Sequence, residues 1–94
     1  MTSIAHMTSA EIKKYRALAH PLKPVVIIGQ AGLTESVLTE INNALEHHEL
    51  IKIRVNALDR ENRSEITNQI LTSLNATLIQ QIGHTVSIYR KREN

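Results

Sequence analysis

The residues best suited to chemistry in this sequence form a short glycine loop, Gly29-Gln30-Ala31-Gly32, which follows an apolar run and precedes a candidate helix cap at Thr34. Glycine lets a backbone approach a phosphate closely, and a helix N-terminus supplies N–H groups that have no partner within the helix. A strand, a loop and a helix in this order therefore predict a cradle for a nucleic-acid backbone. A turn that needs a positive φ is the commoner origin of such a pattern, so the pattern alone leaves both interpretations open.

The loop lacks the residues that would make it a nucleotide site. A phosphate-binding loop of an NTPase ends in Lys followed by Ser or Thr, whereas Gly32 is followed by Leu33 and Thr34. The third glycine of a dinucleotide-binding loop is also missing. Nucleotide binding is therefore disfavoured.

The histidines do not predict a metal site. His47 and His48 are adjacent at the end of a candidate helix, so their side chains point in different directions, and no pair has a helical ligand spacing such as H-E-x-x-H. Interaction of His47 or His48 with the dipole at the helix C-terminus is the better account. Because the chain has no cysteine, thiolate metal sites, disulfides and thiolate catalysis are excluded, and we expect no cofactor.

No set of residues predicts catalysis. Thr34 and Ser36 occupy positions typical of helix caps and solvent-facing turns, and nothing in the pattern buries Glu46 or Glu49. A chain of 94 residues fits one small domain and leaves no room for a cleft between two domains. We therefore predict that the protein is not an enzyme.

The charges are unevenly distributed along the chain. Residues 34–50 contain four glutamates and no lysine or arginine, a net charge of −4, whereas the other 77 residues hold all 11 basic residues and the remaining five acidic ones, a net charge of +6. A bipolar surface follows from this division. The only aromatic residues besides histidine are Tyr15 and Tyr89, too few for a sheet that stacks bases on aromatic rings, so nucleic-acid binding would depend on backbone and charge.

Capping and turn residues define the elements that would position the loop. Thr8 and Glu11 form a capping box, Thr34 and Asp59 are further N-caps, and Asn75 tolerates a left-handed helix end. The predicted order is a helix after Thr8 that ends before Pro21, a strand Val25–Ile28, a helix from Thr34 to His47 or His48, a strand Leu50–Val55, a helix from Asp59 to about Asn75, and strands Thr77–Ile82 and Thr85–Tyr89 joined by a Gly83-His84 turn.

Two strands differ in their apolar pattern. Four consecutive β-branched residues from Val25 to Ile28 predict a strand covered on both faces, hence a central or well-shielded one. Leu50–Val55 alternates, which predicts one buried face and one solvated face that carries Lys52 and Arg54. The fold class is α/β: a single compact α-β-α-β-α-β-β domain with a four-stranded mixed sheet, in which two helices act as crossovers.

The boundaries follow from the same patterns. Residues 1–7 are expected to be a flexible leader, residues 8–92 the domain, and residues 93–94 a tail. No signal peptide or membrane-spanning segment is evident, so a cytoplasmic location is expected.

Three linked segments, Leu18–Val26, Ile28–Glu35 and Ala44–Ile53, closely resemble the YhbY-like RNA-binding family, the stand-alone form of the CRM domain named for chloroplast RNA splicing and ribosome maturation. The resemblance extends from about Thr8 to Arg92. It implies a fold similar to the C-terminal domain of translation initiation factor three, RNA as the ligand, and precursors of the large ribosomal subunit as the assembly.

The resemblance also implies a site. In the family, the GxxG loop and an adjacent basic surface contact RNA. In this sequence that surface corresponds to Gly29, Gln30, Ala31 and Gly32, with Arg16, Lys23, Lys52 and Arg54 as candidate neighbours. Family loops often carry a basic or polar residue between the glycines, whereas this loop offers an amide and a methyl group, so lysine and arginine elsewhere would supply most of the salt-dependent energy.

Two hypotheses follow. The first is a monomeric RNA-binding protein that acts on structured ribosomal RNA in assembly of the large subunit, with ribosomal proteins as further partners. The second is a protein-interaction adaptor whose acidic helix, which lies within the acidic segment 34–50, docks a basic partner. Charge reversal at Glu40 and Glu46 would separate them, since it should spare RNA affinity under the first hypothesis and abolish recovery of the partner under the second.

Overall fold

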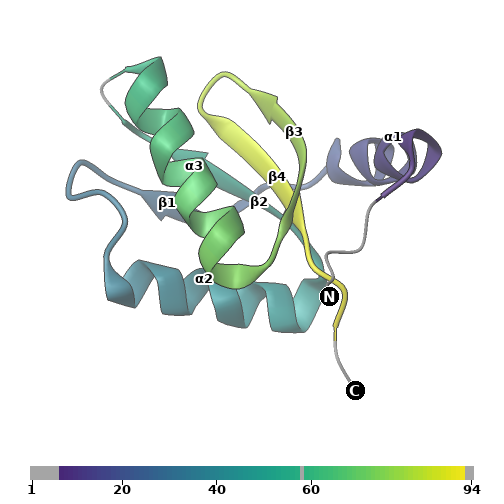
Figure 1. Ribbon diagram of the computed structural model, residues 1–94, viewed down its shortest axis with the longest axis horizontal. Helices are drawn as coiled ribbons and strands as arrows, with labels where there is room; N and C mark the ends of the chain where they lie inside the picture. The colour runs from purple at the N-terminus through teal and green to yellow at the C-terminus, as the bar shows by residue number, and fades with distance from the viewer. Residues whose placement is uncertain (1–6, 58, 93–94) are drawn as a thin grey trace.

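The computed structural model describes residues 7–57 and 59–92, so the predicted leader and tail lie almost wholly outside the described residues. The order and type of the elements are as predicted. They are α1 (Ser9–Ala19), β1 (Pro24–Ile28), α2 (Glu35–His48), β2 (Leu50–Val55), α3 (Arg60–Leu74), β3 (Thr77–Ile82) and β4 (Thr85–Tyr89) (Figure 1).

The helices begin where their capping residues predict. Thr8 and Glu11 form a reciprocal capping box, with backbone-to-side-chain distances of 2.9 and 3.1 Å. The Asp59 carboxylate accepts from the Asn62 N–H at 2.8 Å and starts α3. At its other end, α3 stops at Asn75, which has the left-handed φ of 54° that asparagine tolerates.

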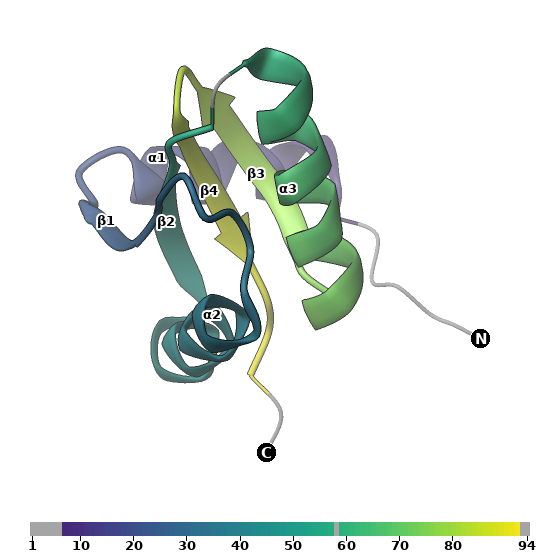
Figure 2. The ribbon, with the colours of Figure 1, turned by 90° about the vertical axis from the view of Figure 1, so that its left-hand side faces the viewer.

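The four strands form one mixed sheet in the order β1-β2-β4-β3 (Figure 2). β1 is parallel to β2, and β4 is antiparallel to both of its neighbours, β2 and β3. Consequently β1, β2 and β3 all run in one direction, and their carboxyl ends reach the same edge of the sheet. The glycine loop leaves β1 at this edge, and the predicted Gly83-His84 turn joins β3 to β4 there.

The two faces of the sheet are covered differently. Side chains of α2 and α3 pack against one face and form the main core with alternate residues of β1, β2 and β4. α1 packs against the other face, where Tyr15 contacts Tyr89, at one end of the molecule (Figure 1). The buried residues of the main core are Val26, Ile28, Ile41, Leu45, Ile51, Ile53, Val55, Ile66, Ile70, Val86 and Ile88.

The prediction that the first strand is central or shielded on both faces is wrong. β1 is an edge strand, and its outward side chains Val25 and Ile27 are 49% and 61% exposed. Only Val26 and Ile28 enter the core. β-branched residues favour the strand conformation itself, so an unbroken run of them does not require burial on both sides.

None of the helices in the described ranges is both long and apolar enough to cross a membrane.

Candidate nucleic-acid interface

The glycine loop forms a tight turn between β1 and α2. The Gly32 N–H donates to the Gly29 carbonyl at 3.1 Å, which places Gln30 and Ala31 at the exposed apex. Gly32 has a φ of 81°, a left-handed conformation in which a side chain would be strained. The turn therefore explains why position 32 is glycine.

Gly29 has no such explanation. Its φ lies outside the left-handed region, and a Cβ built on it would meet no heavy atom within 4 Å. The chain's own fold therefore tolerates a side chain at position 29. The absence of one leaves open space at the base of the loop, where another molecule's backbone can approach.

The helix that follows the loop has a mixed electrostatic effect. The Thr34 hydroxyl caps α2 by accepting from the Val37 N–H at 3.2 Å, and the positive end of the helix dipole faces the loop. Exposed Glu35 stands in the first turn and brings a negative charge to the same place. An anion at the loop is attracted by the dipole and repelled by this carboxylate.

Arg54 is the predicted cation that the fold brings beside the loop. It lies directly opposite Ile27 on β1, and the Asn56 N–H donates to the Ile28 carbonyl at 2.9 Å, which ties the end of β2 to the start of the loop. The Arg54 Nε donates to the Asn56 side-chain oxygen at 3.0 Å. This contact holds an exposed guanidinium near the base of the loop.

On its other side, the end of β2 is tied to the β3–β4 turn. The Val55 N–H donates to the His84 carbonyl at 2.7 Å, and the His84 Nδ1 lies 3.2 Å from the Val55 carbonyl oxygen. Loop, strand end and turn thus form one continuous edge, with Arg54 between them.

The other three predicted cations lie further from the loop. Lys52 comes two residues before Arg54 on β2, which places it about 7 Å further from the loop. Its ammonium donates to the His20 carbonyl at the end of α1 at 3.4 Å. Lys23 lies on the connection from α1 to β1. Arg16 is on α1, which Figures 1 and 2 place at the opposite end of the molecule from the loop. The structure therefore groups the loop with Arg54, and not with all four cations.

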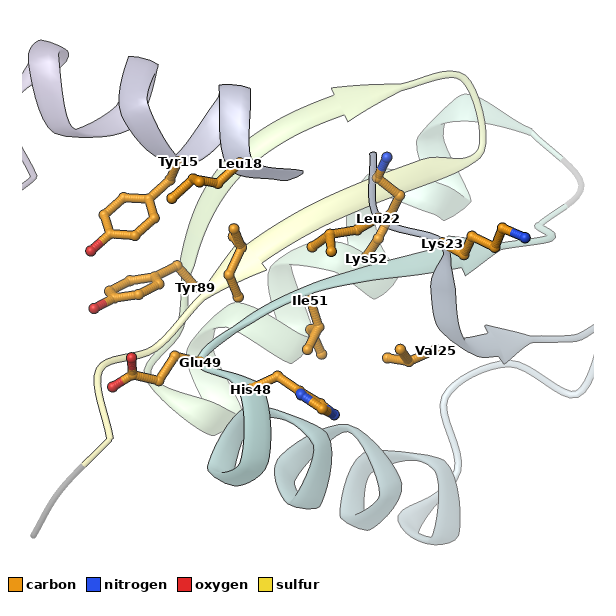
Figure 3. A pocket seen from close by; sticks show the side chains of 11 residues that line it. Tyr15, Leu18, Leu22, Lys23, Val25, His48, Glu49, Ile51, Lys52 and Tyr89 are labelled. Carbon is orange, nitrogen blue, oxygen red and sulfur yellow. The ribbon is translucent and has the colours of Figure 1, made fainter. Parts of the chain in front are cut away.

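Lys23 and Lys52 instead line an open apolar groove of about 630 Å³ (Figure 3). The groove opens where the pairing of β1 with β2 begins, since the first partners are Pro24 and Lys52 and the preceding residues of β2 have no partner on that side. Its other lining residues are Tyr15, Leu18, Leu22, Val25, His48, Glu49, Leu50, Ile51 and Tyr89.

The two tyrosines, far apart in sequence, stack at one end of the groove. Their ring centroids are 4.3 Å apart and their planes are tilted by 30°. The neighbouring Tyr15 hydroxyl, followed by partial burial and the carboxylates of Glu49 and Glu11, raises the pKa of Tyr89 to about 12. The folded protein therefore holds the Tyr89 proton more tightly than an exposed tyrosine does.

The acidic helix is partly neutralised by the chain's own C-terminal residues. Arg90 forms a 2.8 Å ion pair with Glu46, and the Glu49 carboxylate accepts from the backbone N–H of Arg92 at 2.7 Å. Arg92 also donates to carbonyls in the last turn of α2. Two of the four glutamates that motivated the adaptor hypothesis are thus engaged within the molecule.

Histidine and carboxylate side chains do not suggest a metal centre. Within residues 7–57 and 59–92, no three of them converge as a metal site would require. His47, in the last turn of α2, instead places its Nδ1 3.0 Å from the Asn43 carbonyl one turn earlier, in agreement with the predicted interaction at the helix end.

Comparisons with known proteins agree with this architecture. The chain is 51% identical over 78 residues to an RNA-binding protein of Haemophilus influenzae, covering 83% of this chain and 79% of that protein. It is 36% identical over 85 residues to a protein of Pseudomonas aeruginosa named as a probable RNA-binding protein, covering 90% and 82%. The solution structure of a hypothetical protein from Staphylococcus aureus superimposes with a TM-score of 0.82 at 29% identity, covering 95% of this chain and 93% of that one.

The family match covers nearly the whole domain. Residues 7–90 match the model of the CRS1 / YhbY (CRM) domain, from just before the capping box of α1 to the end of β4. The chain therefore belongs to the CRS1 / YhbY (CRM) domain family.

Proposed function

We propose that this protein binds RNA, holding a phosphate group at the Gly29–Gly32 loop with Arg54 beside it. The observation that carries the proposal is Gly29, a glycine that neither the backbone conformation nor the surrounding space requires. Close approach of a phosphate to the loop backbone would explain why position 29 is glycine. The two relatives from Haemophilus influenzae and Pseudomonas aeruginosa, both named for RNA binding, support the same ligand.

Binding at this edge needs no catalytic group. The loop and the dipole of α2 would orient a phosphate, and the Arg54 guanidinium would neutralise it, so affinity would fall as salt rises. Base sequence is not read by such contacts. We propose a non-enzymatic role in which the protein positions RNA.

The resemblance to YhbY-like proteins refines this role. We propose that the RNA is structured ribosomal RNA, that the protein acts as a cytoplasmic monomer, and that it takes part in assembly of the large ribosomal subunit. Sedimentation of the tagged protein from growing cells through a sucrose gradient tests this, with a parallel sample treated with RNase. Co-migration with large-subunit particles that is lost with RNase supports the role, whereas material that stays at the top of the gradient contradicts it.

A pair of substitutions at the loop apex tests the binding site itself. Ala31 is exposed, so Ala31→Glu and Ala31→Gln both fit the fold and differ mainly in charge. With a labelled ribosomal RNA stem-loop as the probe, Ala31→Glu should weaken binding about tenfold and Ala31→Gln should retain it, because only the first places an anion against the phosphate. Equal affinity of the two variants would remove the loop from the site.

A further inference from the structure

A row of four side chains crosses the outer face of the sheet beside the loop. Ile27 lies opposite Arg54, Arg54 opposite Thr85, and Thr85 opposite Ile82, so the row spans β1, β2, β4 and β3 in turn (Figure 2). Residues directly opposite each other in a sheet point to the same face. The row therefore lies on the face away from α2 and α3.

This row is uncovered. Ile27 and Ile82 are 61% and 64% exposed, the highest values among the large apolar residues that are exposed in the described part of the chain. α1 covers the other end of the same face, where Tyr15 meets Tyr89. With strands about 4.8 Å apart, the row is about 14 Å wide, enough for more than one flat ring.

The chemistry of the row favours RNA over a protein surface. Its only charge is the Arg54 guanidinium, which the Asn56 side-chain oxygen holds in place through Nε, and it contains no carboxylate. The row is also continuous with the loop, because Ile27 is two residues before Gly29. Arginine planes stack on unpaired bases. The apolar face of a base that packs against an aliphatic side chain is removed from water, which is favourable.

We propose that the row Ile27–Arg54–Thr85–Ile82 accepts unpaired nucleobases of the RNA whose phosphate the glycine loop holds. This inference rests on the proposed function and adds the class of RNA: a segment with unpaired nucleotides next to the loop contact. Bases within a duplex are stacked and paired, so they cannot lie flat on the row. The protein would therefore prefer RNA with unpaired bases, although its sequence lacks the aromatic rings on which sheets commonly stack bases.

The test compares two labelled RNAs that share one strand: a stem with an unpaired tail, and the same strand fully paired. The variants Ile27→Ser and Ile82→Ser alter exposed side chains, so both should fold. Each should weaken binding of the tailed RNA about five- to tenfold, which is the lower end of the range for loss of an aromatic stacking partner. The slope of log affinity against log salt should stay unchanged, because no charge is lost.

Two controls make the test specific. Leu18→Ser changes an apolar residue of α1 that is 51% exposed and lies in the groove outside the row, and it should leave binding unchanged. Arg54→Lys keeps the charge but removes the planar guanidinium that would stack on a base. It should therefore weaken binding of the tailed RNA and leave the slope of log affinity against log salt nearly unchanged. Neither Ile27→Ser nor Ile82→Ser should affect binding of the paired RNA.

The outcomes separate this inference from the proposed function. Equal binding of tailed and paired RNA, untouched by Ile27→Ser, would overturn the inference and leave RNA binding intact. Failure to bind either RNA would overturn both. A dimer that forms without RNA and is abolished by Ile27→Ser would assign the row to a second copy of the chain, and equal loss with Leu18→Ser would assign the bases to the groove.

Discussion

Arg90, immediately after β4, contacts Glu46 in α2 at 2.8 Å, and the same guanidinium donates to the Asn42 side chain at 2.9 Å and the Leu74 carbonyl at 3.1 Å. One cation thus joins the end of the sheet to α2 and to the end of α3. Its side chain is only 17% exposed, so most of its donors are paired within the protein. This basic residue is part of the fold's structural support, at the C-terminal end of the acidic helix.

Arg90→Ala should lower the free energy of unfolding by about 1–3 kcal/mol, because it leaves partly buried acceptors without a donor. Urea denaturation of the two proteins measures the difference. Lys91→Ala removes a neighbouring exposed charge and should change stability by less than about 0.5 kcal/mol. Equal effects of the two substitutions would show that Arg90 acts only through net charge.

The elements could be predicted because their signals are local. Capping residues such as Thr8 and Asp59 fix helix starts, and the alternation from Leu50 to Val55 fixes the buried face of β2. The order of strands is not local, and the edge position of β1 was missed for this reason. Its exposed Ile27 belongs to a row whose other members lie up to 58 residues away on other strands, and only the register brings them together.

The candidate site was predictable to a similar extent. The glycine loop stands out in the sequence, and the structure places Arg54 beside it. Nothing in the sequence separates Arg54 from Lys52, since both lie on the outer face of β2. The difference between them arises from the end of α1, where the His20 carbonyl accepts from the Lys52 ammonium.

The two glycines of the loop should respond differently to alanine. Gly32→Ala should cost about 1 kcal/mol of stability, because position 32 has a φ of 81°. Gly29→Ala should not lower the urea midpoint, because the backbone at position 29 accepts a side chain. It should weaken RNA binding several-fold, since its methyl group fills space that the fold leaves empty. Unchanged RNA affinity of Gly29→Ala, measured by fluorescence anisotropy, would contradict the proposed phosphate contact.

Arg54 and Lys52 should differ in their contribution to the salt dependence. Arg54→Ala should reduce the slope of log affinity against log salt by about 0.7–0.9, the value for one phosphate contact. Lys52→Ala should change it by less, because Lys52 lies further from the loop and donates to the His20 carbonyl. If both variants reduce the salt slope equally, the RNA contacts Lys52 at the groove as well as Arg54 at the loop.

Tyr89 should make stability depend on pH in the alkaline range. Its pKa is raised to about 12 in the folded protein from the ordinary value of 10.0, so the folded state retains the proton when the unfolded state has lost it. The contribution is therefore fully present below pH 10 and is lost as pH rises towards 12. Urea midpoints across this range should fall less steeply for Tyr89→Phe, and identical profiles would show that other groups cause the loss.

Glu35 should oppose RNA binding while it supports the helix. A carboxylate in the first turn of α2 interacts favourably with the helix dipole, so Glu35→Gln should cost about 0.3–1 kcal/mol of stability. The same substitution removes a negative charge next to the proposed phosphate site, so RNA affinity should rise about two- to fivefold.

Stability and affinity then change in opposite directions, which a general loss of structure cannot produce. Glu40→Gln is the matched control, since Glu40 is exposed on the same helix more than one turn from the loop and should affect affinity less. If the two variants raise affinity equally, the effect reflects net charge rather than position. If Glu35→Gln alone raises it, the bound phosphate lies at the start of α2, where the loop and the helix N-terminus meet.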